Sequence, residues 1–193
     1  MAPRVGALLT PGAGADREQP ALVAVDKALS RLGIVVERMD FPYRIAGRKA
    51  PDRAPVLIDA VNQGAAALAK RARIKPANLL LGGRSMGGRM CSMAVAQGLP
   101  AKGLVLISYP LHPPGRPDKQ PERTAHFPDI AVPCLFVSGT RDAFGTPEEL
   151  AEATTTVAGG VDHVWIDGGD HGLRRRDDEV ADAVVEWVRT RFG

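Results

Sequence analysis

Short apolar segments alternate with helical patterns along this chain, and this alternation restricts its possible folds more than any other feature. Most of the segments lack polar residues, which is typical of strands buried on both faces of a sheet. Helices between consecutive strands supply the crossovers that parallel strands require. The pattern predicts an α/β fold, in which helices cover both faces of a doubly wound parallel sheet of about six strands in three α/β/α layers. The expected strands lie at 5–9, 34–36, 79–81, 104–107, 134–137 and 161–166.

Apolar residues at helical spacing predict the segments that cover the sheet. Thr146 and Glu149 have the spacing of a capping box at the start of one of them. Two stretches lack helical spacing. The first, 41–53, is rich in Arg, Lys and Pro, and the second, 109–129, contains six prolines and is expected to form a long surface loop. The expected helices begin near residues 20, 55, 86, 147 and 177.

Length and composition exclude several functional classes. The 193 residues are expected to form one domain, 1–193, with 45% hydrophobic residues, 24% charged residues and a net charge of +3. Arginines are scattered among acidic residues, so no nucleic-acid partner is expected. No apolar run approaches membrane-spanning length and no signal peptide is evident, which favours a cytoplasmic protein without a membrane partner. Cys91 and Cys134 are expected to be reduced core residues, and no metal or cofactor site is expected.

The segment Gly83-Arg84-Ser85-Met86-Gly87 is a G-x-S-x-G motif between an expected strand and an expected helix. A serine raised on such a sharp turn takes a strained backbone, and glycines two positions away avoid collisions with the neighbouring segments. This context favours a nucleophile elbow. The alternatives are a glycine-rich turn of a nucleotide-binding fold and a chance match.

Parallel α/β sheets bind ligands at the carboxyl ends of their strands. Ser85, Asp142 and His171 each follow a different expected strand, and the sequence places all three at that edge. His112 also follows a strand at this edge and is the alternative base, while Asp170 is the alternative acid. We expect His126 to be solvated in its loop and His163 to be a structural residue inside a strand.

These residues predict acyl transfer through a covalent intermediate. His171 would take the proton of Ser85 while Asp142 holds the imidazole in place. The backbone N–H groups of Met86 and Ala13 are the expected oxyanion hole, and Gly12 lets the loop approach the substrate closely.

With these residues the chain resembles small α/β-hydrolases related to dienelactone hydrolases and carboxylesterases. The resemblance covers nearly the whole chain and implies a minimal fold without a cap domain, with strand order 2-1-3-4-5-6. Ser85, Asp142 and His171 match the triad of that family one by one. The segments that carry the closest match are Gly12-Ala13-Gly14, 47–55, 109–115 and Ser138-Gly139-Thr140-Arg141-Asp142.

The resemblance leaves two classes of function. The first is a serine hydrolase acting on small-molecule esters. The second is a protein-interaction module, because the same compact subgroup includes a subunit of a chromatin-modifying complex and a fold alone does not establish catalysis. One departure is that Pro11-Gly12 stands where such hydrolases often carry His-Gly.

The expected site is open and small, because the stretch 109–129 is too short for a helical cap. Two basic loops, 44–53 and 116–123, follow strands at the same edge. Arg48 and His112 are therefore candidate substrate contacts, and esters carrying an anionic group are the candidate substrates. The alternative is that these arginines pair with Asp52, Asp118 or Glu122 and stay solvated. Nothing in the sequence determines the oligomeric state.

Overall fold

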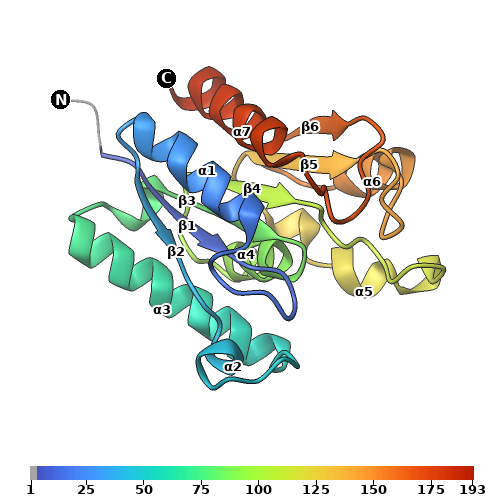
Figure 1. Ribbon diagram of the computed structural model, residues 1–193, viewed down its shortest axis with the longest axis horizontal. Helices are drawn as coiled ribbons and strands as arrows, with labels where there is room; N and C mark the ends of the chain where they lie inside the picture. Colours follow the sequence, from blue (N-terminus) through green and yellow to red (C-terminus); the bar gives the residue numbers. More distant parts are fainter. Residues whose placement is uncertain (1–3) are drawn as a thin grey trace.

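The computed structural model describes residues 4–193 and contains one sheet of six parallel strands, which confirms the predicted α/β fold (Figure 1). The strand order is β2-β1-β3-β4-β5-β6, as the resemblance implied. The chain winds in one direction from β1 to β2 and in the other from β3 onward, so the switch point lies between β1 and β3. The strands are β1 (Gly6–Thr10), β2 (Val35–Arg38), β3 (Leu79–Arg84), β4 (Gly103–Ile107), β5 (Cys134–Gly139) and β6 (Val161–Ile166).

Helices cover both faces of the sheet, which gives the three predicted layers (Figure 1). Helices α1 and α7 lie side by side on one face, and α3 and α4 lie together on the other. Helix α6 begins with the predicted capping box between Thr146 and Glu149. The helices are α1 (Pro20–Arg31), α2 (Pro42–Ile45), α3 (Ala54–Ala72), α4 (Met86–Ala96), α5 (Pro121–Thr124), α6 (Pro147–Thr154) and α7 (Asp177–Phe192).

The central strands divide their side chains between two hydrophobic cores. In β3, Leu79 and Leu81 belong to the core under α3 and α4, whereas Leu80 belongs to the core under α1 and α7. The side chains of a strand alternate between its faces, so an uninterrupted apolar segment fills both cores. This arrangement fixes the central strands and leaves their carboxyl ends free to carry polar residues.

The two stretches without helical spacing are more ordered than predicted. The first contains α2, and the prediction of a long surface loop for 109–129 is wrong. That segment forms α5 and the short 3-10 helices η2 (Pro117–Lys119) and η3 (Phe127–Asp129). Tyr109, Leu111 and Phe127 are completely or almost completely buried in the core beside α4. Burial of these apolar side chains stabilises the segment in a fixed position. Its prolines disfavour long helices, so the helices within it are short.

Cys91 and Cys134 are free and buried, as predicted. Burial raises the pKa of each thiol to about 12, because the apolar surroundings disfavour the thiolate. Within residues 4–193, no helix is long and apolar enough to cross a membrane.

Candidate active site

Ser85 stands on the sharp turn between β3 and α4, at the switch point of the sheet. Its φ of 51° and ψ of −117° lie in a region that L-amino acids rarely adopt. The Ser85 N–H donates to the carbonyl oxygen of Ile107 at 2.8 Å, so the end of β4 holds the turn in place. The strained backbone and the following helix are the features of a nucleophile elbow.

Gly83 and Gly87 leave room for this turn against the end of β1. A Cβ atom on Gly83 would lie 2.1 Å from Thr10 Oγ1, and a Cβ atom on Gly87 would lie 2.5 Å from the carbonyl oxygens of Thr10 and Pro11. Real Cβ atoms do not approach backbone this closely. The two glycines of the motif are therefore required because β1 and its loop pass directly beside the serine.

His171 connects Ser85 to Asp142. His171 Nε2 lies 2.9 Å from Ser85 Oγ, and His171 Nδ1 lies 2.8 Å and 3.0 Å from the two carboxylate oxygens of Asp142. Asp142 is 4% exposed, so its carboxylate is nearly sealed from water. Three residues that follow three different strands therefore meet at one edge of the sheet, as the sequence predicted.

The partners of His171 determine where its proton resides. A carboxylate only accepts hydrogen bonds, so Nδ1 carries the proton and Nε2 presents its lone pair to the Ser85 hydroxyl. The Phe144 N–H donates to Asp142 Oδ1 at 2.8 Å, and the Phe144 ring stacks on the imidazole with 3.9 Å between ring centroids. Phe144 thus contacts both Asp142 and His171, and no sequence pattern indicated these contacts.

The loop after β1 is held by two side chains from other elements. The Gly12 N–H donates to Gln19 Oε1 and the Gly14 N–H donates to the hydroxyl of Tyr43, both at 3.0 Å. The Ala13 N–H between them has no acceptor within hydrogen-bond distance among residues 4–193. Gln19 and Tyr43 therefore support the loop that carries Pro11-Gly12 in place of His-Gly.

Met86 is the first residue of α4 and also offers a free backbone donor. The first N–H groups of a helix have no acceptor within the helix, and they carry the positive end of its dipole. The N–H groups of Met86 and Ala13 are the two donors predicted from the sequence to form an oxyanion hole. Their use in catalysis remains a prediction.

Arg84 joins the serine turn to the histidine loop. Its Nη2 donates to the backbone carbonyl of His171. Burial lowers the pKa of Arg84, although Asp142, Asp170 and Asp177 attract its charge and oppose this effect. The sequence did not predict this contact, because Arg84 occupies the variable position before the serine and His171 lies 87 residues further along the chain.

None of the other three histidines is hydrogen-bonded to Ser85. Both ring nitrogens of His112 face acceptors, the Pro113 carbonyl at 2.9 Å and Glu149 Oε2 at 3.3 Å. The expectation that His126 is solvated is wrong, because His126 is half-buried and its Nε2 lies 2.8 Å from Ser92 Oγ. His163 Nε2 lies 3.0 Å from the hydroxyl of Thr154, in the structural role expected of it.

Several cations of the two basic loops are paired with acids, whereas Lys49, Arg53 and Arg123 have no carboxylate oxygen within 4.0 Å among residues 4–193. Arg48 binds Asp52 at 2.8 Å, Arg116 binds Asp118 at 2.8 Å, and Lys119 binds Glu122 at 2.6 Å. The alternative of local pairing therefore holds for Arg48, Arg116 and Lys119. These loops offer less free positive charge to a substrate than the sequence suggested.

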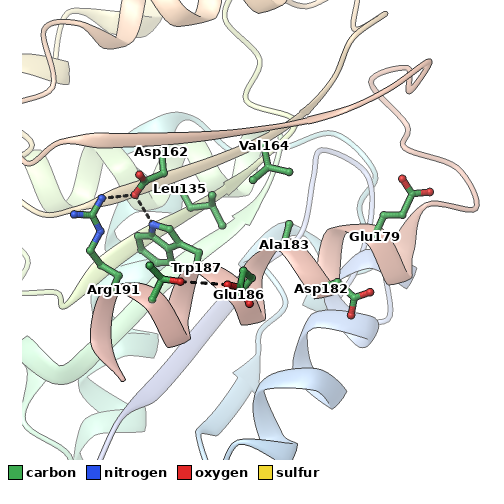
Figure 2. A pocket seen from close by; sticks show the side chains of 10 residues that line it. Leu135, Asp162, Val164, Glu179, Asp182, Ala183, Glu186, Trp187 and Arg191 are labelled. Atoms are coloured by element: carbon green, nitrogen blue, oxygen red, sulfur yellow. Dashed lines mark hydrogen bonds and ion pairs between the residues drawn. The ribbon is translucent and has the colours of Figure 1, made fainter.

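A cavity of about 810 Å³ lies between β6 and α7, away from the serine (Figure 2). Leu135, Val164, Ala183 and Trp187 line its apolar part. In Figure 2 the indole nitrogen of Trp187 points to Asp162, to which it donates at 2.7 Å. No member of the Ser85–His171–Asp142 cluster lines this cavity, so its size does not identify it as the active site.

A family model described as an alpha/beta hydrolase domain matches residues 3–189 of the chain. The chain belongs to this alpha/beta hydrolase family. The match covers almost the whole sequence, and it agrees with the sheet order and with the nucleophile turn of the structure. Within residues 4–193 of this hydrolase-family member, no group of three or more His, Cys, Asp or Glu residues is arranged to hold a metal ion.

Solved structures of other alpha/beta hydrolases share the fold. The chain is similar to an alpha-beta serine hydrolase homologue from Coxiella burnetii, with 17% identity, 94% of this chain and 84% of that chain covered, and a TM-score of 0.77. A dienelactone hydrolase from Anabaena variabilis has 18% identity, coverage of 98% and 87%, and a TM-score of 0.77. A serine hydrolase without a lid from Xanthomonas campestris has 19% identity, coverage of 98% and 84%, and a TM-score of 0.75.

Proposed function

We propose that this hydrolase-family member is a serine hydrolase that cleaves small carboxylic esters through an acyl-enzyme on Ser85. The observation that carries the proposal is the continuous chain of hydrogen bonds from Ser85 Oγ through His171 to the buried carboxylate of Asp142. The backbone of Ser85 is strained, and its hydroxyl is hydrogen-bonded to a histidine whose other nitrogen binds a carboxylate. A purely structural serine would not require this combination.

Each group has one role in the first half of the proposed reaction. Ser85 Oγ attacks the ester carbonyl carbon while its proton moves to His171 Nε2. The N–H groups of Met86 and Ala13 bind the oxygen that becomes negative, and Asp142 stabilises the imidazolium without taking its proton. The tetrahedral intermediate then expels the alcohol, which receives the proton from Nε2, and the acyl group remains on Ser85.

Water completes the reaction by the same path in reverse. His171 Nε2 takes a proton from water as its oxygen attacks the acyl carbon. Collapse of the second intermediate releases the carboxylic acid and returns the proton to Ser85 Oγ. No bound cofactor takes part in any of these steps.

The segment between β4 and β5 supports a preference for small substrates. Tyr109 donates to the carbonyl of Arg123 at 2.7 Å, and Arg123 Nη1 donates to the carbonyl of Pro110 at 3.0 Å. These bonds and the buried Phe127 hold the segment down against the sheet, where it cannot enclose a long acyl chain. We therefore propose short esters that approach an open site from solvent.

A fluorophosphonate probe tests the proposal, because it reacts covalently with an activated serine. The probe should label the wild type and the Ser92→Ala variant, whereas Ser85→Ala should remain unlabelled. Ser92 is a suitable control because it also contacts a histidine but is completely buried. Failure of the folded wild type to react would contradict the hydrolase proposal and favour the interaction module that shares this fold.

A further inference from the structure

Three arginines that lie outside the two basic loops line one cavity beside the active site. Arg84, Arg174 and Arg175 border a space of about 530 Å³ between the first turns of α1 and α7. Among residues 4–193, none of these three side chains has a carboxylate oxygen within 4.0 Å. Their charges therefore differ from those of Arg48 and Arg116, which ion pairs already satisfy.

Two of the lining residues, Arg84 and Gln19, carry hydrogen-bond donors that lie near Gly12. The position that a Cβ atom would take on Gly12 lies 3.5 Å from Arg84 Nη1, 3.6 Å from Gln19 Nε2 and 3.6 Å from the carbonyl oxygen of Arg84. Gln19 Oε1 accepts the Gly12 N–H, so the amide nitrogen of Gln19 is a donor on the other side of its side chain. Neither nitrogen has an acceptor within hydrogen-bond distance among the residues that the structure describes.

The acidic residues nearby do not neutralise the cavity. Asp177 is the one acidic residue in its lining, against three arginines. Asp142 attracts Arg84 but is bound to His171. Asp170 also attracts Arg84 and is not in the lining, although its Oδ1 lies 2.9 Å from the Cβ position of the lining residue Gly172. A guanidinium withdrawn from water without an ion partner is unfavourable, and an oxyanion that accepts its N–H groups would offset this cost.

We propose that this cavity binds an oxyanion, a carboxylate or phosphate group, through Arg84 Nη1 and Gln19 Nε2, with Arg174 and Arg175 at its mouth. Arginine suits this role because its planar guanidinium donates two parallel hydrogen bonds to such groups. The bound group is coupled to the active site, because Arg84 also holds the His171 carbonyl and Gln19 holds the loop of Ala13. The oxyanion is either a separate small anion or the charged end of an ester substrate, and the second case rests on the proposed function.

Calorimetric titration with inorganic phosphate and with succinate tests the binding without relying on catalysis. The Ser85→Ala protein should bind at least one of these anions with saturation. Binding should be about tenfold weaker or more in a protein that also carries Arg174→Gln and Arg175→Asn, because two positive charges at the mouth of the cavity are removed. Asparagine is chosen at position 175 because φ there is 61°, a conformation that asparagine tolerates.

The matched control replaces two arginines that are already paired, by Arg48→Gln and Arg116→Gln in the same Ser85→Ala background. This control should keep its affinity for the anion. The absence of saturable binding to either anion, or an equal loss of affinity in the control and in the Arg174/Arg175 variant, would overturn the proposal.

Hydrolysis assays on the wild type then identify the source of the anion. A higher kcat/KM for p-nitrophenyl hemisuccinate than for p-nitrophenyl acetate, with phosphate as a competitor, supports the charged end of the substrate. A change in p-nitrophenyl acetate hydrolysis when phosphate binds supports a separate anion. If bound phosphate changed the kcat/KM of neither ester, the proposed coupling through Arg84 would be refuted. Failure to hydrolyse either ester would contradict the proposed function and leave the titration result unaffected.

Discussion

Among residues 4–193, two serine–histidine hydrogen bonds have nearly equal length, one at the start of α4 and the other within this helix. Ser85 Oγ is 2.9 Å from His171 Nε2, and Ser92 Oγ is 2.8 Å from His126 Nε2. Only the first bond continues to a carboxylate, that of Asp142. Ser92 lies within the helix, is completely buried, and donates its own proton to the carbonyl of Arg89 at 2.8 Å.

The surroundings of the two histidines explain why the same contact has different chemistry. Burial, together with the nearby charge of Arg89, lowers the pKa of His126 to about 4, so its imidazole is a weak base at neutral pH. His171 has Asp142 on its other nitrogen, where a carboxylate would stabilise the imidazolium of the proposed reaction. A serine–histidine distance alone therefore does not indicate a nucleophile, and the carboxylate and the exposure of the serine are needed as well.

Replacing the carboxylate should produce the largest effect. Asp142→Asn removes the acceptor that fixes the His171 tautomer, and kcat for p-nitrophenyl acetate should fall by about 10³- to 10⁴-fold. The matched control is Glu149→Gln, because Glu149 contacts His112 at 3.3 Å and glutamine preserves the capping box. That control should keep kcat within about twofold of the wild type, since His112 has no serine partner. Similar losses in both variants would contradict the assignment of His171 as the base.

Ser85 stands on a tight turn that leaves no room for a Cβ atom at position 87, whereas Ser92 lies in the regular part of α4. Gly87→Ala tests this difference. Alanine normally stabilises a helix by up to about 1 kcal/mol relative to glycine. Here its Cβ atom would lie 2.5 Å from two backbone oxygens, so we expect a net loss of about 2 kcal/mol or more in the free energy of unfolding. Gly12→Ala should change that energy much less, because its nearest contact is 3.5 Å. Urea unfolding of both variants measures the contrast, and equal stabilities would refute the steric role of Gly87.

The half-buried His126 should have a smaller effect, on the free energy of unfolding at acid pH. The pKa of His126 is about 4 in the folded protein and 6.5 in its ordinary state, so the unfolded chain binds the proton more readily. The contribution of His126 to stability is complete above pH 6.5 and is lost as the pH falls toward 4. After allowing for its partial exposure, we expect a loss of about 1 kcal/mol that His126→Gln removes. Urea unfolding at both ends of this range measures it, and an equally steep decline in the variant would contradict the assignment.

The sequence determined the sheet well because each central strand is apolar without interruption. Leu79 to Leu81 had to fill both cores, which predicted a parallel sheet and hence the edge where Ser85 would lie. The prediction failed in segment 109–129, where six prolines dominated the local pattern. The deciding interaction there was the burial of Phe127 and Tyr109 beside α4, which depends on residues distant in sequence.

The same limit applies to the candidate site. Its three principal residues were predictable because each follows a strand, and strand ends in a parallel sheet converge. The groups that hold them were not predictable. Phe144 stacks on His171, Arg84 reaches the His171 carbonyl, and Gln19 holds Gly12, and each contact depends on the folded positions of two loops.

The most direct test of the account compares His171→Ala with His126→Ala and His112→Ala as catalysts of p-nitrophenyl acetate hydrolysis. Measured as kcat/KM on variants whose circular dichroism matches the wild type, His171→Ala should lose about 10³-fold or more, because Ser85 loses its base. The other two variants should stay within about tenfold of the wild type, since their histidines contact no exposed serine. Activity retained by His171→Ala, or a comparable loss in either of the other variants, would contradict the central claim that Ser85, His171 and Asp142 form the one catalytic unit.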